Sequence, residues 1–190
     1  MIAKTILLLI TPWVLLHLPE SNYSKMEDKT TTVGQINFSN NPEGSERIED
    51  MSNGEELKML GLINALRKKK GLNALTLNTS LQYACRYHAA DMANEGYFEH
   101  DTYNRIDGDL ELSLDAFERC NRFYQETGYV NSENIAAGDK NASDAFELWL
   151  NSPGHYQNML NKEAKSIGLG YYHNEDSEYG DYWVMETATQ

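Results

Sequence analysis

The chain has 190 residues, of which 41% are hydrophobic and 24% charged, enough for one packed domain with terminal segments. Its formal net charge is −13, so long-range repulsion disfavours binding to nucleic acid or to an anionic membrane surface. The charge excludes little else, because many soluble proteins are acidic.

The first 19 residues have the features of an export signal. Lys4 supplies a positive charge, and an apolar run over residues 5–18 follows it. The run is too short for a comfortable membrane span, so no transmembrane segment is predicted beyond the signal itself. Since no clear A-x-A cleavage pattern follows, a signal peptide and a signal anchor are both open. Either one predicts a secreted, periplasmic or extracellular protein.

The next segment, residues 20–52, is predicted to be a polar, disordered linker. It is rich in Asn, Ser, Thr and acidic residues and has few large apolar side chains. Such a composition buries too little surface to offset the entropy lost on ordering. The folded domain is therefore predicted to cover residues 53–190.

Helical spacing of apolar residues begins near residue 53. Leu57, Leu60 and Ile63 predict a first helix that stops at Gly71, after three lysines that suit the negative end of the helix dipole. A second helix is predicted from about 80 to 95, just before Gly96.

The two cysteines fall on apolar helix faces. Cys85 lies on the stripe of the second helix, and Cys120 on that of a third helix predicted from about 113 to 125. Two cysteines in an exported chain suggest one disulfide, but two buried thiols are an equal alternative, because sequence separation does not report geometry. No C-x-x-C pair exists, so neither a structural zinc site nor a thioredoxin-like site is predicted.

The C-terminal third changes from helical to strand periodicity. A fourth helix is predicted over 143–150 with Ser143 as its N-cap, and Ser152-Pro153 opens a fifth helix that runs to residue 160. Two strands are predicted over 166–172 and 182–188. Glycines alternate in the first of these strands, which indicates that another element packs close to one face of the sheet. Helices followed by a hairpin predict an α+β or layered sandwich domain.

Three residues are the candidates for a functional site. His155 falls at the third position of the fifth helix, where the positive helix end favours a neutral imidazole that can ligate a metal or act as a base. His100 follows aromatic residues in the loop after the second helix, and Glu133 stands before small apolar residues. The sequence has no HExxH, GxSxG, P-loop or GxGxxG motif.

Several segments carry recognisable motifs. These are Y-F-E-H at residues 97–100, S-E-N-I-A at 132–136, W-L-N-S-P-G-H at 149–155, I-G-L-G-Y at 167–171 and Y-W at 182–183. In this order they resemble the loop after the second helix, the G-E-N-I-A motif, the bacterial W-x-N-S-P-G-H motif and the closing hairpin of one family. Over about residues 57–187 the chain therefore resembles the CAP superfamily (cysteine-rich secretory protein, antigen 5 and pathogenesis-related 1), in its bacterial SCP-like branch. The resemblance implies a three-layer α/β/α sandwich, with a small antiparallel sheet flanked by helices.

The family resemblance also implies a cleft with two histidines and two acidic residues, which can bind a divalent metal. Matched by motif, His100, Glu133 and His155 would line this cleft, and the two histidines would hold the metal. Ser152 stands where the eukaryotic branch has its second glutamate, so the full set is absent and no cofactor is required. Zinc or another divalent cation is the candidate if one binds.

Three hypotheses follow. In the first, the protein is a secreted binding or interaction module for an extracellular ligand, with lipids and cell-envelope components as candidates. In the second, it is a divalent-metal-assisted hydrolase of peptides or cell-wall material, in which Glu133 is the general base. In the third, the same residues form a buried structural network. No complete catalytic constellation is visible, so the sequence leans away from an enzyme.

Overall fold

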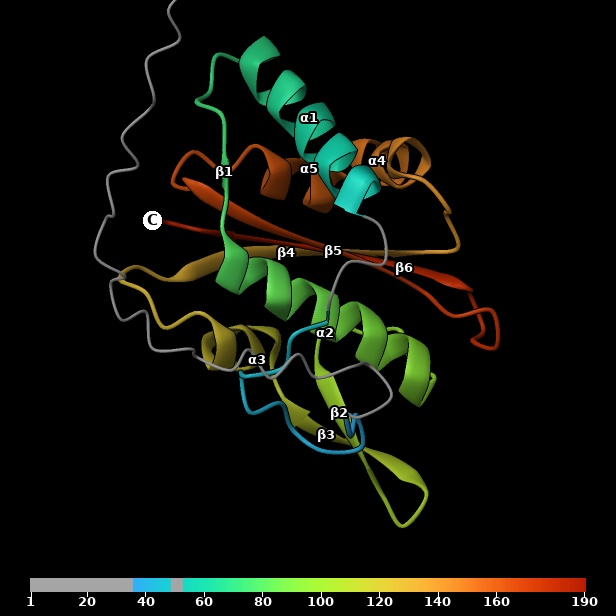
Figure 1. Ribbon diagram of the computed structural model, residues 1–190. Helices are drawn as coiled ribbons and strands as arrows, with labels where there is room; N and C mark the ends of the chain where they lie inside the picture. Colours follow the sequence, from blue (N-terminus) through green and yellow to red (C-terminus); the bar gives the residue numbers. More distant parts are fainter. Residues whose placement is uncertain (1–35, 49–52) are drawn as a thin grey trace, which may run out of the picture.

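The structure, a computed structural model, describes residues 36–48 and 53–190 and forms three layers (Figure 1). One layer of helices lies on each side of a central sheet, and a separate hairpin extends from the α2 side. The helices are α1 (Asn53–Lys69), α2 (Thr79–Glu95), α3 (Ala116–Phe123), α4 (Ala142–Asn151) and α5 (Pro153–Met159). The strands are β1 (Thr76–Leu77), β2 (Thr102–Ile106), β3 (Asp109–Leu114), β4 (Val130–Ala137), β5 (Ser166–His173) and β6 (Asp181–Ala188).

The central sheet has the strand order β1-β5-β6-β4. The three long strands pair antiparallel, and the two-residue β1 joins β5 in parallel. Helices α1, α4 and α5 cover one face, and α2 and α3 cover the other (Figure 1). The predicted α+β class and α/β/α sandwich are therefore confirmed.

The two glycines of β5 explain how closely α2 lies on the sheet. A Cβ atom added at Gly168 would lie 2.4 Å from the carbonyl carbon of Leu81, and one at Gly170 would lie 2.3 Å from that of Cys85. Both contacts are far inside van der Waals distance, so only glycine allows this approach. The close packing predicted from the alternating glycines is confirmed, and the packed element is α2.

A hairpin that was not predicted from the sequence moves the start of the third helix. Strands β2 and β3 are joined by Asp107 (φ 52°) and Gly108 (φ 96°), a left-handed pair that favours a tight two-residue turn. The apolar residues before Cys120 therefore belong partly to β3. Helix α3 begins only after Asp115, which forms a capping box with Glu118.

The other helix boundaries lie near their predicted positions. Helix α2 is capped by Asn78, whose side chain accepts from the backbone of Leu81, and it ends at the left-handed Gly96. The N-cap of α4 is Asn141 rather than Ser143, because the longer amide side chain accepts from two backbone N–H groups. Helix α5 opens at Pro153, as predicted.

Part of the predicted linker packs against the domain. Within residues 36–48, Phe38 is 6% exposed and Ile48 1% exposed, and the Phe38 ring lies 5.5 Å from that of Tyr87. Hydrogen bonds from Ser39 to Glu95 and from Tyr87 to the backbone oxygen of Asn40 add to this packing, so a segment of mostly polar composition is held against α2. The packed unit thus includes residues before the predicted boundary at 53. The signal prediction (1–19) and residues 20–35 and 49–52 lie outside the described residues.

The two cysteines are buried free thiols. Burial raises the pKa of both Cys85 and Cys120 well above the usual range, so neither is a ready nucleophile. Of the two alternatives left open, the structure has the pair of thiols and not the disulfide.

Candidate functional site

Two glutamates face each other at the centre of the site. Glu133 on β4 pairs in register with Glu186 on β6, and the two residues are 6% and 0% exposed. Like charges directly opposite on neighbouring strands repel, and burial removes the water that would screen them. The pair therefore needs a buried cation or a proton.

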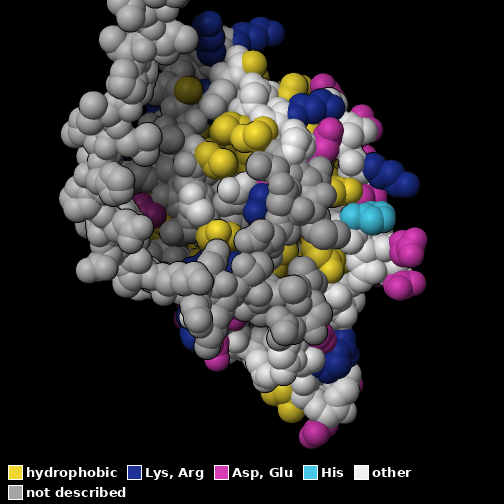
Figure 2. Space-filling view, viewed as in Figure 1, with side chains coloured by type: hydrophobic (Ala, Val, Ile, Leu, Met, Phe, Trp, Pro, Cys, Tyr) yellow, Lys and Arg dark blue, Asp and Glu magenta, His cyan; other side chains and the backbone are white. Residues whose placement is uncertain are grey.

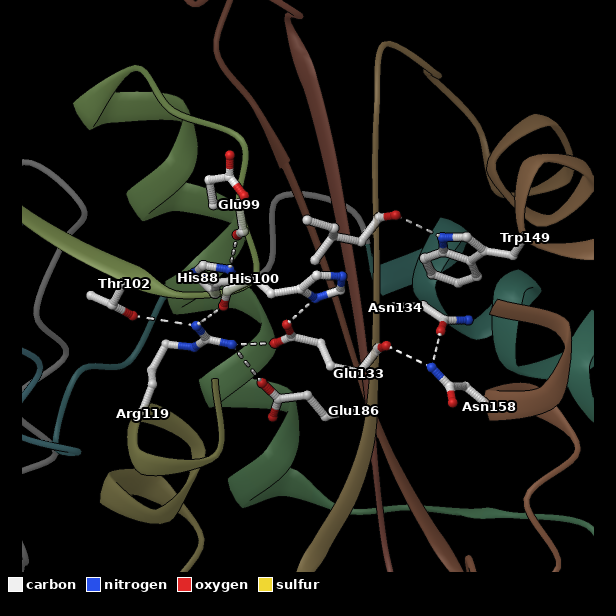
Figure 3. A network of polar contacts seen from close by, with 11 residues as sticks. His88, Glu99, His100, Thr102, Arg119, Glu133, Asn134, Trp149, Asn158 and Glu186 are labelled. Atoms are coloured by element: carbon white, nitrogen blue, oxygen red, sulfur yellow. Dashed lines mark hydrogen bonds and ion pairs between the residues drawn. The ribbon is translucent and has the colours of Figure 1, made fainter. Parts of the chain in front are cut away.

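Arg119 supplies the cation from α3. Its side chain is fully buried and its Nη2 forms an ion pair with Glu133, while Glu186 Oε1 lies 3.4 Å from the same nitrogen (Figure 3). Its Nη1 donates to the backbone oxygen of His100 at 2.7 Å and to Thr102 Oγ1 at 3.3 Å. One guanidinium thus joins β4, β6, β2 and the His100 loop.

Neither Arg119 nor Glu186 was among the candidate residues predicted from the sequence. Arg119 stands three residues after Ala116 and four before Phe123, both buried, so it lies on the inward face of α3. A charged residue on an apolar helix stripe was the available signal. Glu186 carried a similar signal, because it directly follows three apolar residues, 183–185, within a segment predicted to be a strand.

His100 reaches Glu133 from the loop that follows α2. Its Nδ1 lies 2.8 Å from Glu133 Oε1, and its side chain is 51% exposed (Figure 3). An ionised carboxylate only accepts, so Nδ1 carries the hydrogen and Nε2 is left for other contacts. The hydrogen bond to Glu133 raises the pKa of His100 against the opposing effect of burial. The residue before His100 is also fixed in place: Nε2 of buried His88 lies 3.0 Å from the backbone oxygen of Glu99.

The two glutamates have opposite protonation states at neutral pH. Burial alone would raise the pKa of Glu133, but the charge of Arg119 and the hydrogen bond from His100 outweigh it and lower that pKa to about 2. Burial raises the pKa of Glu186 to about 8 against the pull of Arg119, and the Glu133 charge adds to the rise. The cluster therefore holds Glu133 as an anion and Glu186 as a neutral acid.

His155 is connected to the Glu133 strand through its backbone. It lies half-buried on α5, and its backbone oxygen accepts from Asn134 Nδ2 at 3.0 Å. Asn158, one turn further along α5, donates to the backbone oxygen of Glu133 at 2.9 Å and to Asn134 Oδ1 at 2.8 Å. Burial lowers the pKa of the His155 imidazole and the His100 charge adds to this. The structure thus brings His100 and Glu133 into contact and ties the helix that carries His155 to the same strand.

A cleft of about 450 Å³ opens beside this cluster. It is lined by polar groups from four segments and by one exposed ring, that of Phe117, which is 45% exposed. His155 is not among the lining residues. The lining residues are His100, Asp101, Asp115, Ala116, Phe117, Asn131, Ser132, Glu133 and Asn158.

The donor set does not fit a tightly bound metal ion. His100 and His155 would offer two imidazole nitrogens, and both oxygens of Glu133 are engaged by His100 and Arg119. Structural and catalytic zinc sites take three or four protein ligands. In the described part of the chain, three ligand-type side chains converge only at Cys120, Glu133 and Glu186, where the Arg119 guanidinium already supplies the positive charge.

Comparison with protein families gives one match over most of the chain. The model of the cysteine-rich secretory protein family (CAP) matches residues 60–187. Two proteins of Bacillus subtilis (strain 168) are similar. The one named "Uncharacterized protein YkwD" is 32% identical over 133 residues, which are 69% of this chain and 46% of that protein. The "Uncharacterized membrane protein YlbC" is 30% identical over 125 residues, 66% of this chain and 34% of that protein. The chain thus spans less than half of either relative.

Solved structures share the fold. An extracellular protein of Bacillus anthracis str. Ames that contains an SCP domain matches with a TM-score of 0.62 and 25% identity, over 74% of this chain and 42% of that chain. An outer surface protein of Borrelia burgdorferi matches with a TM-score of 0.60 and 22% identity, over 75% of this chain and 98% of that chain. In residues 36–48 and 53–190, no helix has the length and apolar character needed to cross a bilayer.

Proposed function

Because the chain belongs to the cysteine-rich secretory protein (CAP) family, we propose that it is an extracellular binding module that takes a polar cell-envelope component in the cleft beside His100 and Glu133. The similar structures that are named outer-surface and extracellular proteins support this location, as does the export signal predicted over residues 1–19.

The observation that carries the proposal is that both carboxylate oxygens of buried Glu133 are already engaged, one by His100 and the other by Arg119. A general base works best when its pKa is near the working pH, whereas the pKa of Glu133 is lowered to about 2. The side chain is also only 3% exposed. Glu133 is thereby suited to orient His100 and hold three segments together, and not to accept a proton from water.

The cleft offers the groups that recognise a glycan or a similar polar ligand. Asp101 and Asp115 line the cleft with carboxylate groups, and the exposed ring of Phe117 offers a flat apolar surface. Binding sites of this kind take orientation from a few polar groups and affinity from an aromatic anchor. The single imidazole of His100, fixed through Nδ1, adds a directed contact through Nε2.

A binding experiment tests the proposal. The purified protein is incubated with insoluble peptidoglycan at several concentrations, and the bound fraction is measured after sedimentation. Phe117→Ala is expected to weaken binding about five- to tenfold, because buried aromatic anchors carry more than about 1 kcal/mol at interfaces. Leu57→Ala is the matched control, since Leu57 is 50% exposed on α1, on the other side of the sheet. Equal binding by all three proteins, or none, would contradict the proposal.

The hydrolase alternative has its own test. Zinc titration followed by calorimetry compares the protein with a His100→Ala/His155→Ala variant. Because two imidazoles fall short of a zinc ligand set, we expect millimolar or weaker uptake by both and peptidoglycan binding that survives a chelator. Tight, histidine-dependent zinc uptake would favour the hydrolase.

A lipid is the second candidate ligand, and a separate surface favours it. An apolar groove of about 280 Å³ lies between α1 and α4, and it is lined by Leu62, Ala65, Leu66, Lys69, Phe146 and Leu150. Lys69 at its edge suits the acidic head group of a fatty acid. Retention of a fluorescent fatty acid, lost in Leu66→Asp and kept in Phe117→Ala, would assign the lipid to this groove.

A further inference from the structure

A basic pocket lies apart from the cleft, and we propose that it binds the phosphate group of a phosphate ester. The pocket is a hollow of about 390 Å³ where the end of α1, the connection to β1 and the segment before β5 meet. It shares no lining residue with the cleft, so it is independent of the proposed function. The residues that line it are Arg67, Gly71, Leu72, Asn73, Ala74, Thr76, Lys162, Ala164 and Lys165.

The charge at this pocket is opposite to that of the whole molecule. The chain has a net charge of −13, yet six of its 16 basic residues fall in two short segments, 67–70 and 162–165. Three of them line the pocket, and no Asp or Glu does. The one acidic residue in these segments, Glu163, directs a carboxylate oxygen to Tyr129 Oη at 3.3 Å. Dark blue side chains gather at the end of α1 in Figure 2.

The floor of the pocket is a buried cation with no anion beside it. Arg67 is 1% exposed, and its guanidinium donates to the backbone oxygens of Asn73, Met159, Asn161 and Ala164 at 2.8–3.5 Å. These carbonyls satisfy its hydrogen bonds but carry no full charge. No carboxylate lies within ion-pair distance of Arg67 in the described part of the chain. A bound oxyanion would neutralise this charge in a partly desolvated place, where the gain is largest.

The rim supplies hydrogen-bond donors that are still free. Lys162 and Lys165 are exposed, and across residues 36–48 and 53–190 neither ammonium has an ion-pair partner. Asn73 and Ala74 are exposed residues, and their backbone N–H groups donate to no acceptor among those residues. Ammonium groups together with consecutive backbone amides are the usual donors to phosphate oxygens. The pocket thus combines charge, donors and a hollow of suitable size.

Titration with phosphate esters, followed by backbone NMR shifts, tests the proposal. The probes are inorganic phosphate and glycerol 3-phosphate. We expect saturable shifts confined to residues 71–76 and 162–165, with binding that weakens as salt is raised. Lys162→Gln/Lys165→Gln is expected to weaken binding roughly tenfold, since it removes two charge-assisted contacts. Lys58→Gln/Lys140→Gln removes the same charge elsewhere and is expected to change the affinity less than about twofold.

A second variant and a vesicle arm complete the test. Ala74→Glu introduces a carboxylate into the pocket and leaves Arg67 unchanged in the sequence. It is expected to abolish the NMR shifts caused by phosphate. Vesicles with phosphatidylglycerol, compared with phosphatidylcholine alone, distinguish a lipid head group from a soluble ester as the source of the phosphate. The proposal is overturned if neither source binds at about 10 mM phosphate. It is also overturned if the two lysine pairs weaken binding equally, because the attraction would then be non-specific.

Discussion

The opposed pair Glu133 and Glu186 leads to a prediction in which two chemically identical substitutions have opposite effects. Both residues are buried glutamates on adjacent strands, and both are changed to glutamine. Glu133→Gln removes the anion that pairs with Arg119, whereas Glu186→Gln imitates the neutral acid that Glu186 already is at pH 7.

The magnitude for Glu186 follows from its pKa, which burial raises from 4.5 to about 8. Since the folded pKa is above the unfolded one, the folded state holds an extra proton between these values, and stability falls as pH rises through them. At about 1.4 kcal/mol per pH unit, the loss between about pH 4.5 and pH 7 is about 3 kcal/mol. A glutamine side chain cannot ionise, so Glu186→Gln is expected to be about 2 to 3 kcal/mol more stable than the parent at pH 7 and equally stable near pH 4.

The pH dependence of stability has the opposite sign for Glu133. Its folded pKa is lowered to about 2, so its contribution is complete above about pH 4.5 and is lost as pH falls toward 2. Glu133→Gln is expected to cost about 3 kcal/mol at pH 7, near the lower end for a broken buried ion pair, because Glu186 can ionise and partly replace the missing charge.

Urea unfolding followed by tryptophan fluorescence, at steps from pH 4 to pH 8, measures both effects, because Trp149 and Trp183 are fully buried. The two single variants serve as controls for each other. Buried Asp91, whose pKa burial also raises to about 8, adds a fall of its own in every variant. Two results would refute the assignment for Glu186: a loss of stability at pH 7 in Glu186→Gln as large as that in Glu133→Gln, or a fall between pH 5 and 8 as steep in Glu186→Gln as in the parent.

Three further predictions concern the site and the packing around it. NMR titration should place the pKa of His100 above its usual range, and in Glu133→Gln it should return toward that range, because the hydrogen bond to the carboxylate is the main cause of the rise; an unchanged value would rule out this contact. Gly168→Ala should lower the free energy of unfolding in urea by about 3 kcal/mol, since the new Cβ would lie 2.4 Å from the carbonyl carbon of Leu81. Gly61→Ala is the control, because nothing lies within 4 Å of a Cβ at this position of α1, and it should cause no loss. Phe38→Ala should lower the free energy of unfolding by about 3 kcal/mol, because the Phe38 side chain is only 6% exposed. Its control is Leu112→Ala, where the side chain is 63% exposed and the loss should be below about 0.5 kcal/mol. Equal losses would show that residues 36–48 do not pack stably on the domain.

Local patterns accounted for much of the fold. The helices that begin near residues 53, 80 and 153 and the strands at 166 and 182 follow from apolar periodicity and from glycine and proline at their ends. The β2–β3 hairpin was missed although Asp107-Gly108 and the alternation of Leu110, Leu112 and Leu114 indicate it, because the end of this segment was assigned to the third helix. The packing of residues 36–48 was not predicted because three buried residues, Phe38, Pro42 and Ile48, do not change the average composition of a polar segment.

The site was predicted only in part, for a related reason. Family motifs singled out His100 and Glu133, which the structure places 2.8 Å apart through Nδ1 and Oε1. Arg119 belongs to no motif, although it determines the charge of Glu133.

The sequence by itself determined helices α1, α2, α4 and α5, strands β5 and β6, and the close contact at the glycines of β5, because these depend on residues close together in the chain. Only the tertiary structure decided that Arg119, Glu133 and Glu186 share one buried charge centre. Their protonation depends on burial and on charges up to 67 residues apart, and neither can be read from local spacing. The same holds for the basic pocket, where Arg67 meets Lys162 and Lys165 only because α1 packs beside the segment before β5.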